Sequence, residues 1–173
     1  MFFTSSIYAK ELREADFIAE FGQPSNPELL LNVRGSVILD NIDRDTVFTY
    51  LANLENDPNI YPGTFSSALI SGNGGVGSIY HETIYFGGTV GDIVVTVLEY
   101  KDDKWFKFKS DNLLQNVSAY RITPARKHGV KVELESFVEV PMGVTQADME
   151  NFMTLVLQSI ITEMNTTGQI TIH

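Results

Sequence analysis

The feature that most constrains the fold is one long amphipathic helix that follows a run of strands. Residues 65–140 read almost throughout as strands and turns, whereas residues 145–165 read as a single helix. A lone helix after antiparallel strands must bury its apolar side against the sheet. A curved sheet that holds one helix leaves room for a hollow between them, and such hollows bind small molecules. The sequence therefore predicts an α+β domain with an internal cavity of about 300–1,000 Å³.

Composition narrows the classes of partner. The chain of 173 residues carries a net charge of −10 and contains no cysteine. Strong negative charge disfavours nucleic acids and anionic bilayers, which bind clustered Lys and Arg. The lack of cysteine rules out disulfides and thiolate metal sites, and the three His are too scattered for a zinc motif. We expect no nucleic-acid partner, no metal and no cofactor.

The membrane and targeting signals are weak. No apolar run approaches the ~20 residues that are needed to span a bilayer. The first residues lack a basic start and are soon followed by Lys10 and Glu11. This pattern favours a cytoplasmic protein over a secreted one.

The first 28 residues differ from the rest, and we treat residues 1–28 as an N-terminal extension and 29–173 as the ligand-binding domain. Ser5 or Ser6 is a candidate cap for a helix that ends near Phe21, where Gly22 and Pro24 follow. One apolar stripe of this helix is made of Leu12, Ala15, Ile18 and Phe21. The helix either packs on the outside of the domain or serves as a lid or as the arm of a homodimer.

The remaining elements follow from alternation and turn residues. A first strand at 29–40 precedes a short helix, for which Asp43 is the expected N-cap. Residues Asn56-Asp57-Pro58 end that helix, because the residue before proline avoids helical geometry. Six further strands are predicted at 65–71, 78–86, 89–100, 104–110, 116–123 and 130–140.

The segment Gly72 to Gly77 matches the G-x-G-x-x-G pattern of dinucleotide-binding loops. That motif needs a helix after it, because the helix N-terminus holds the pyrophosphate. The residues that follow, from Ser78 to Phe86, are β-branched and aromatic and read as a strand. We therefore interpret the glycines as a flexible hairpin loop, in a position suited to the mouth of a pocket.

Several short pieces resemble a known family. They are Val37-Ile-Leu-Asp40, Val47-Phe-Thr-Tyr-Leu51, Tyr61-Pro-Gly63, Gly75-Val-Gly-Ser78, Tyr120-Arg-Ile122 followed by Pro124, and residues 130–140 followed by Pro141. Together, over residues 30–164, they resemble the START/Bet v 1-like (SRPBCC) superfamily and its polyketide cyclase/dehydrase-like members. The chain departs from that pattern at Asn41-Ile-Asp43, where members often carry proline.

The resemblance implies a helix-grip fold, in which a seven-stranded antiparallel sheet wraps around the C-terminal helix. It also implies an internal cavity for an apolar or aromatic ligand. Members of the superfamily range from ring-closing enzymes to carriers without catalysis, so the fold alone does not decide the function.

Candidate ligand-binding residues come from the helix and from inward-facing strand positions. On the helix, apolar side chains at helical spacing include Met149, Phe152, Met153, Val156 and Ile160. On the strands, alternation turns Phe106, Phe108, Tyr120, Ile122 and Leu134 toward the helix. These side chains form either plain core or a cavity wall, and unbranched Met side chains suit a wall that adapts to its ligand.

Candidate acid–base groups lie on the strand at residues 78–86. Either Tyr80, Glu82 and Ile84 face inward, or His81 and Tyr85 do, because alternate residues point to opposite faces. A carboxylate in an apolar hollow has a raised pKa that suits proton transfer, and an imidazole beside a phenol is also usable. We favour Glu82 with Tyr80 as catalytic residues and keep His81 as the alternative.

Three functions fit these observations. The first is an enzyme that cyclises or dehydrates a polyketide-like or lipid-like substrate by acid–base chemistry. The second is a carrier or sequestering protein that holds a hydrophobic small molecule without changing it. The third is a protein-interaction module, which would need an exposed apolar patch.

Overall fold

The computed structural model describes residues 11–173 except 103 and 127. The helices are α1 (Glu14–Phe21), η1 (Pro27–Leu29), α2 (Arg44–Ala52), η2 (Leu54–Asn56), α3 (Asp57–Ile60) and α4 (Gln146–Glu163), where η denotes a short 3-10 helix. The strands are β1 (Leu30–Leu39), β2 (Thr64–Ser71), β3 (Ile79–Phe86), β4 (Thr89–Lys101), β5 (Trp105–Asn112), β6 (Gln115–Pro124), β7 (Val130–Glu139) and β8 (Gly168–Ile172). The seven predicted strands and the long helix are confirmed, with ends that differ by one or two residues.

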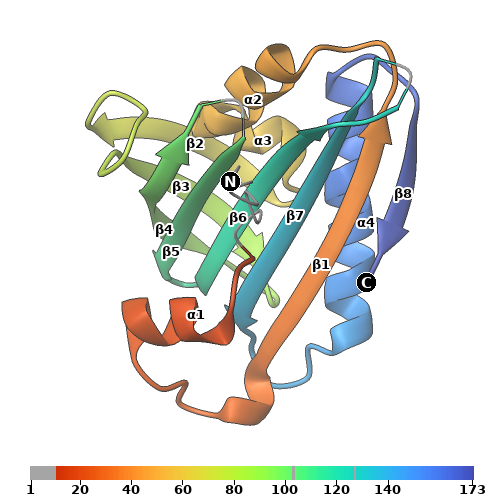
Figure 1. The fold of residues 1–173 in the computed structure, drawn as a ribbon. Helices are drawn as coiled ribbons and strands as arrows, with labels where there is room; N and C mark the ends of the chain where they lie inside the picture. Colours follow the sequence, from red (N-terminus) through yellow and green to blue (C-terminus); the bar gives the residue numbers. More distant parts are fainter. Residues whose placement is uncertain (1–10, 103, 127) are drawn as a thin grey trace, which may run out of the picture.

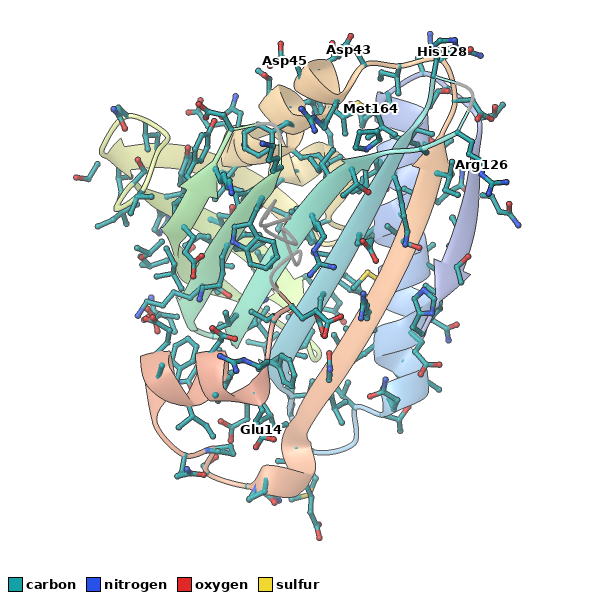
Figure 2. All side chains as sticks on the ribbon, viewed as in Figure 1. Glu14, Asp43, Asp45, Arg126, His128 and Met164 are labelled. Atoms are coloured by element: carbon teal, nitrogen blue, oxygen red, sulfur yellow. The ribbon has the colours of Figure 1, made fainter. Side chains whose placement is uncertain are left out.

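The strands form one antiparallel sheet in the order β2-β3-β4-β5-β6-β7-β1-β8. The sheet curves around α4, which lies along its concave side, while α1 lies across the opposite side (Figure 1). This arrangement confirms the predicted helix-grip fold. Helix α2 begins as predicted after Asp43, which lies at its N-terminus (Figure 2). The side chain of Asp43 accepts a hydrogen bond from Thr46 N at 2.8 Å.

The sheet has eight strands where seven were expected, because the chain forms β8 after α4. β8 pairs with β1 on the side opposite β7, and Ile172 lies across from Gly35. A Cβ atom at Gly168 would lie 2.8 Å from Val37 Cγ2, so glycine allows β8 to start close to the core. The segment is only five residues long, which is too short for its alternation to stand out in the sequence.

The main core lies between the concave face of the sheet and α4. Gly35 in β1 faces the helix, and a Cβ atom there would lie 2.8 Å from Leu157 Cδ1 and 2.8 Å from Met153 Cγ. Any side chain at this position would push the helix away from the sheet. The bare backbone of Gly35 therefore sets how closely α4 approaches β1.

A second, smaller core lies on the outer side of the sheet beneath α1. It consists of Leu12, Phe17, Trp105, Val117, Ala119 and Phe137. Lys107 ties the helix to the sheet, because its Nζ atom lies 3.1 Å from Asp16 Oδ1 and 2.9 Å from Glu99 Oε1. The N-terminal helix thus packs on the outside of the sheet, as the first of the two interpretations stated.

The details of that helix differ from the sequence prediction. It begins at Glu14, and its predicted start at Ser5 or Ser6 lies outside the described residues. Phe17 is its fully buried residue, whereas Ala15 of the predicted stripe is exposed. Leu12 precedes the helix, so the assumed helical spacing from Leu12 does not apply and the buried side is rotated.

Replacing Gly35 with alanine should destabilise the fold. The new methyl group would meet Leu157 and Met153 at 2.8 Å, and overpacking of this kind costs about 1–3 kcal/mol. Urea denaturation followed by circular dichroism measures the loss. Gly75→Ala is the matched control, because a Cβ there meets only Asn73 Oδ1 at 3.3 Å and should leave the free energy of unfolding nearly unchanged. Equal stability of Gly35→Ala and the wild type would contradict this account.

Candidate functional site

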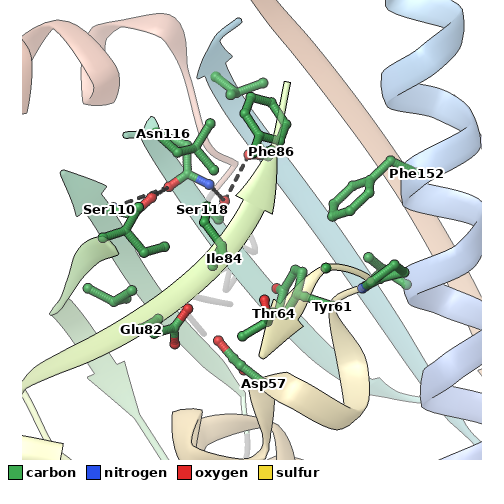
Figure 3. Close-up of a pocket in the computed structure, with 18 of the residues that line it drawn as sticks. Asp57, Tyr61, Thr64, Glu82, Ile84, Phe86, Ser110, Asn116, Ser118 and Phe152 are labelled. Carbon is green, nitrogen blue, oxygen red and sulfur yellow. Dashed lines mark hydrogen bonds between the residues drawn. The ribbon is translucent and has the colours of Figure 1, made fainter. Parts of the chain in front are cut away.

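An internal cavity of about 90 Å³ lies between α4 and the concave face of the sheet. Its wall is mostly apolar, with polar groups at separate places (Figure 3). The residues that line it are Val33, Asp57, Tyr61, Pro62, Gly63, Thr64, Glu82, Ile84, Tyr85, Phe86, Ile93, Val95, Phe108, Ser110, Leu114, Asn116, Ser118, Leu134, Ser136, Val138, Met149, Phe152, Met153 and Val156. The cavity is smaller than the range of about 300–1,000 Å³ expected from the sequence.

Stacked aromatic rings account for the smaller volume. The ring of Phe106 stacks on Tyr120 with a centroid distance of 4.9 Å and on Phe108 at 5.8 Å. Phe48 of α2 then packs edge-on against Phe106 at 6.0 Å. These rings fill the space between the sheet and α2 with solid core.

The ten predicted ligand-binding residues therefore divide into two groups. Phe108, Leu134, Met149, Phe152, Met153 and Val156 line the cavity. Phe106, Tyr120, Ile122 and Ile160 are buried but lie in the solid core and do not line it. Helical spacing and strand alternation placed all of them on the inner side, but neither pattern carries information about where along the sheet the packing opens.

Two carboxyl groups face each other in the cavity wall. Asp57 begins α3 and Glu82 lies in β3, and the two side chains point toward each other (Figure 3). The two residues are only 5% and 3% exposed, respectively. Ser67 of β2 donates a hydrogen bond to Glu82 Oε1 at 2.9 Å. The polypeptide thus brings together two acids that lie 25 positions apart in the sequence.

The surroundings of this pair determine its protonation. Burial raises the pKa of Glu82, and the hydrogen bonds from Ser67 and Asp57 offset only part of that effect. Burial and the neighbouring charge of Glu82 raise the pKa of Asp57 well above its ordinary value. Loss of both protons would place two negative charges side by side away from water. The second proton is therefore harder to remove than the first, and the pair with one proton can both donate and accept a proton.

Two phenols lie close to the acid pair. The hydroxyl oxygens of Tyr61 and Tyr120 are 2.7 Å apart, and the Tyr61 ring stacks against Phe152 of α4 at 6.5 Å. Burial raises the pKa of both phenols. They stay protonated at neutral pH, so they serve as hydrogen-bonding groups and not as bases.

A second polar group of the wall consists of side chains from β5, β6 and β7. The Ser110 hydroxyl donates to Asn116 Oδ1, and Asn116 Nδ2 donates to Ser118 Oγ at 3.2 Å. Ser118 Oγ also lies 2.8 Å from Ser136 Oγ. This cluster is uncharged and can bind a hydroxyl or carbonyl group of a ligand.

The three predicted catalytic residues lie in three different surroundings. Glu82 lines the cavity. Tyr80 faces the same side of β3 but lies beyond the cavity, where it borders a separate hollow under the glycine loop. The side chain of His81 points to the outer face and is 46% exposed, with Nε2 3.8 Å from Asp92 Oδ1. His81 therefore cannot reach a ligand in the cavity.

Sequence reasoning missed Asp57, which it interpreted only as the end of a helix. The residue instead starts α3, so that Asp57 and Tyr61 stand four positions apart around one helical turn. Nothing in the local pattern signals that this acid is buried, because its partner belongs to a distant strand. His128 lies in the exposed turn between β6 and β7, away from the cavity (Figure 2).

Within the described residues, no group of three or more His, Cys, Asp or Glu side chains is arranged to hold a metal ion. No helix in the described part of the chain is both long and apolar enough to cross a bilayer.

The raised pKa of Asp57 predicts how stability changes with pH. Above about pH 4, this carboxyl group binds its proton more strongly in the folded state than in the unfolded chain. Asp57 therefore contributes its full share to the free energy of unfolding at acidic pH, and this contribution is lost as the pH rises through its folded-state pKa. Asp57→Asn keeps a donor to Glu82 but does not ionise, so its free energy of unfolding should rise relative to wild type by up to about 1.4 kcal/mol per pH unit.

Urea denaturation at a series of pH values measures this difference. Asp102→Asn removes one charge from an exposed residue and is the control, for which the difference from wild type should stay constant. A constant difference for Asp57→Asn as well would mean that Asp57 ionises normally in the folded protein.

Solved structures of other proteins share this fold, although sequence comparisons find no match. No protein-family model matches the chain, and no curated protein matches its sequence. The Zhui aromatase/cyclase from Streptomyces sp. R1128 superimposes with a TM-score of 0.64 at 13% sequence identity. The aligned part covers 79% of this chain and 94% of the Zhui chain. A START superfamily protein from Mycobacterium smegmatis has a TM-score of 0.60 at 13% identity, over 76% and 94% of the two chains.

Plant proteins also share the architecture. The ginseng major latex-like protein 151 from Panax ginseng has a TM-score of 0.60 at 14% identity and covers 78% of this chain and 97% of its own. At these identities the likeness concerns the fold, and the chain has the helix-grip fold of the START/Bet v 1-like proteins.

Proposed function

We propose that the protein binds a compact, largely apolar molecule that carries a carbonyl or hydroxyl group, and that it transfers protons on that molecule. The observation that carries this proposal is the buried carboxyl pair of Asp57 and Glu82 in the cavity wall. Burying two acids side by side is costly, and perturbed acids in a concave site are typical of catalytic sites.

The chemistry that suits this pair is the loss of water from a β-hydroxy carbonyl compound. The Glu82 carboxylate takes the proton from the carbon next to the carbonyl. The Asp57 carboxylic acid protonates the hydroxyl group, which leaves as water while a carbon–carbon double bond forms. The pair ends with its single proton on Glu82, and exchange with water restores the first state. Ring closure followed by loss of water uses the same two groups.

The size of the cavity limits the substrate. About 90 Å³ is less than the roughly 150 Å³ of an engineered cavity that binds benzene. A ligand with several fused rings would need Phe152 or Tyr61 to move away from the cavity. We therefore favour a compact substrate over the extended polyketide that the sequence resemblance implied. The hydroxyl and amide cluster around Asn116 would bind its second polar group.

A carrier without chemistry is the second candidate. The observation that favours it is the largely apolar wall, in which the Ser110–Asn116–Ser118–Ser136 cluster is already hydrogen-bonded internally. A carrier of this kind would bind by shape and apolar contact, and the carboxyl pair would then serve only to bind a polar end of the ligand. Turnover separates the two candidates.

Filling the cavity should abolish binding without unfolding the protein. Met153→Trp and Val156→Trp both place an indole into the cavity wall. Binding of 4-hydroxybutan-2-one, a four-carbon β-hydroxy ketone, should then weaken at least about tenfold, which corresponds to 1.4 kcal/mol. Calorimetry or ligand-observed NMR measures the affinity. Leu155→Trp on the exposed side of the same helix is the control and should bind normally. If both inward variants unfold or bind like wild type, this region is packed core and not a binding cavity.

Removing either acid should stop the reaction. Dehydration of 4-hydroxybutan-2-one yields a conjugated ketone, and its ultraviolet absorbance reports turnover. Asp57→Asn and Glu82→Gln should each slow turnover by about 10²–10⁴-fold while the affinity changes little. His81→Gln is the control, because its side chain lies on the outer face. Binding without turnover by the wild type would favour the carrier, and unchanged turnover in both variants would remove the pair from the mechanism.

A further inference from the structure

A second hollow, the outer hollow, lies on the other side of Tyr80 from the internal cavity. It has a volume of about 520 Å³, within the usual range of about 300–1,000 Å³ for small-molecule sites. It is bounded by α2 and η2 on one side and by the glycine loop between β2 and β3 on the other. The residues that line it are Thr49, Ala52, Asn53, Glu55, Leu69, Asn73, Gly74, Gly75, Tyr80 and Tyr100.

The glycine loop is a preformed wall of the outer hollow. Ser78 Oγ accepts hydrogen bonds from the N–H groups of Asn73 at 3.1 Å and Gly74 at 2.8 Å. Asn73 Oδ1 accepts a third, from the N–H of Gly75 at 3.1 Å. These are the backbone groups that would otherwise bind a phosphate, and they are already engaged. The loop therefore gives the hollow its shape but provides no anion site.

Tyr80 forms the floor of the hollow. The residue is 1% exposed, and its hydroxyl group makes no hydrogen bond to any residue that the structure describes. A Cβ atom at Gly74 would lie 3.7 Å from this hydroxyl oxygen, which places it directly beneath the loop. The hydroxyl oxygen is not enclosed in the core, so it opens into the hollow, where a ligand or water completes its hydrogen bonding.

The outer hollow carries negative charge. Glu55 is the only ionised group among its lining residues and borders Tyr80, whose pKa is raised by burial and then by the charge of Glu55. The Tyr80 and Tyr100 rings and Leu69 supply apolar surface next to this charge. Aromatic faces beside a carboxylate attract organic cations, because ring quadrupole and carboxylate both favour positive charge.

We propose that the outer hollow is a second binding site, for a small aromatic amine in its ammonium form. The ammonium group lies between Glu55 and the Tyr80 hydroxyl, which accepts a hydrogen bond from it. The aromatic body of the amine packs against Tyr80, Tyr100 and Leu69. This site is separate from the internal cavity, and it does not depend on the proton-transfer chemistry proposed there.

Nuclear magnetic resonance with phenethylammonium as the probe tests the proposal. Amide signals of Gly74 and Gly75 should shift in a saturable way, whereas the neutral analogue phenethyl alcohol should bind several-fold more weakly. Tyr80→Phe should weaken the ammonium probe by about twofold to twelvefold, the effect of one hydrogen bond. Glu55→Gln should weaken it by about twofold to fivefold at low salt, and this loss should shrink in high salt.

Two controls make the result specific. Glu28→Gln removes the same charge from an exposed residue outside the hollow and should leave affinity unchanged. Met153→Trp, which fills the internal cavity, should also leave it unchanged. No saturable shift at about 10 mM probe, which corresponds to binding weaker than roughly 3 kcal/mol, would overturn the proposal. Shifts that map elsewhere, or equal binding of amine and alcohol, would overturn it as well.

Discussion

The close approach of α4 to β1 is the constraint on which the rest of the structure depends. It is possible only because Gly35 presents bare backbone to Leu157 and Met153. From this contact the helix runs along the concave face, and the sheet has to curve around it to cover its apolar side. The internal cavity lies where the wall of the sheet is lined by serines, a glutamate and small aliphatic side chains. Elsewhere, stacked aromatic rings close the space completely.

Local sequence pattern predicted most of the fold, for reasons that the structure makes clear. Alternation located the strands because one face of each strand meets the core, and the capping residue Asp43 located the start of α2. The pattern failed at short elements. It missed β8, which has five residues, and it placed α1 too early and rotated, since Phe17 and not a regular stripe anchors that helix.

The candidate site was less predictable, because it is made by contacts between distant parts of the chain. Glu82 could be proposed from its strand, since a carboxyl among inward-facing apolar residues stands out. Asp57 could not, because a short helix buries it and its partner is 25 residues away. The choice between Glu82 and His81 also needed the structure, since both faces of β3 carry a mixture of polar and apolar residues. Alternation links Tyr80 to Glu82 but does not reveal that they border different spaces.

The sheet also places its first strand between two of its last. Leu30 of β1 pairs with Glu139 of β7, and Gly35 pairs with Ile172 of β8, so each partner lies more than one hundred residues further along the chain. β1 thus stays unpaired during synthesis until most of the other strands have emerged. Because such distant pairings carry a large entropic cost of closing the loop, they slow folding relative to folds with local contacts. Before β1 pairs, the hairpins from β2 to β7 can form by contacts between neighbouring strands. The internal cavity takes shape only when β1 joins the sheet and α4 packs against it.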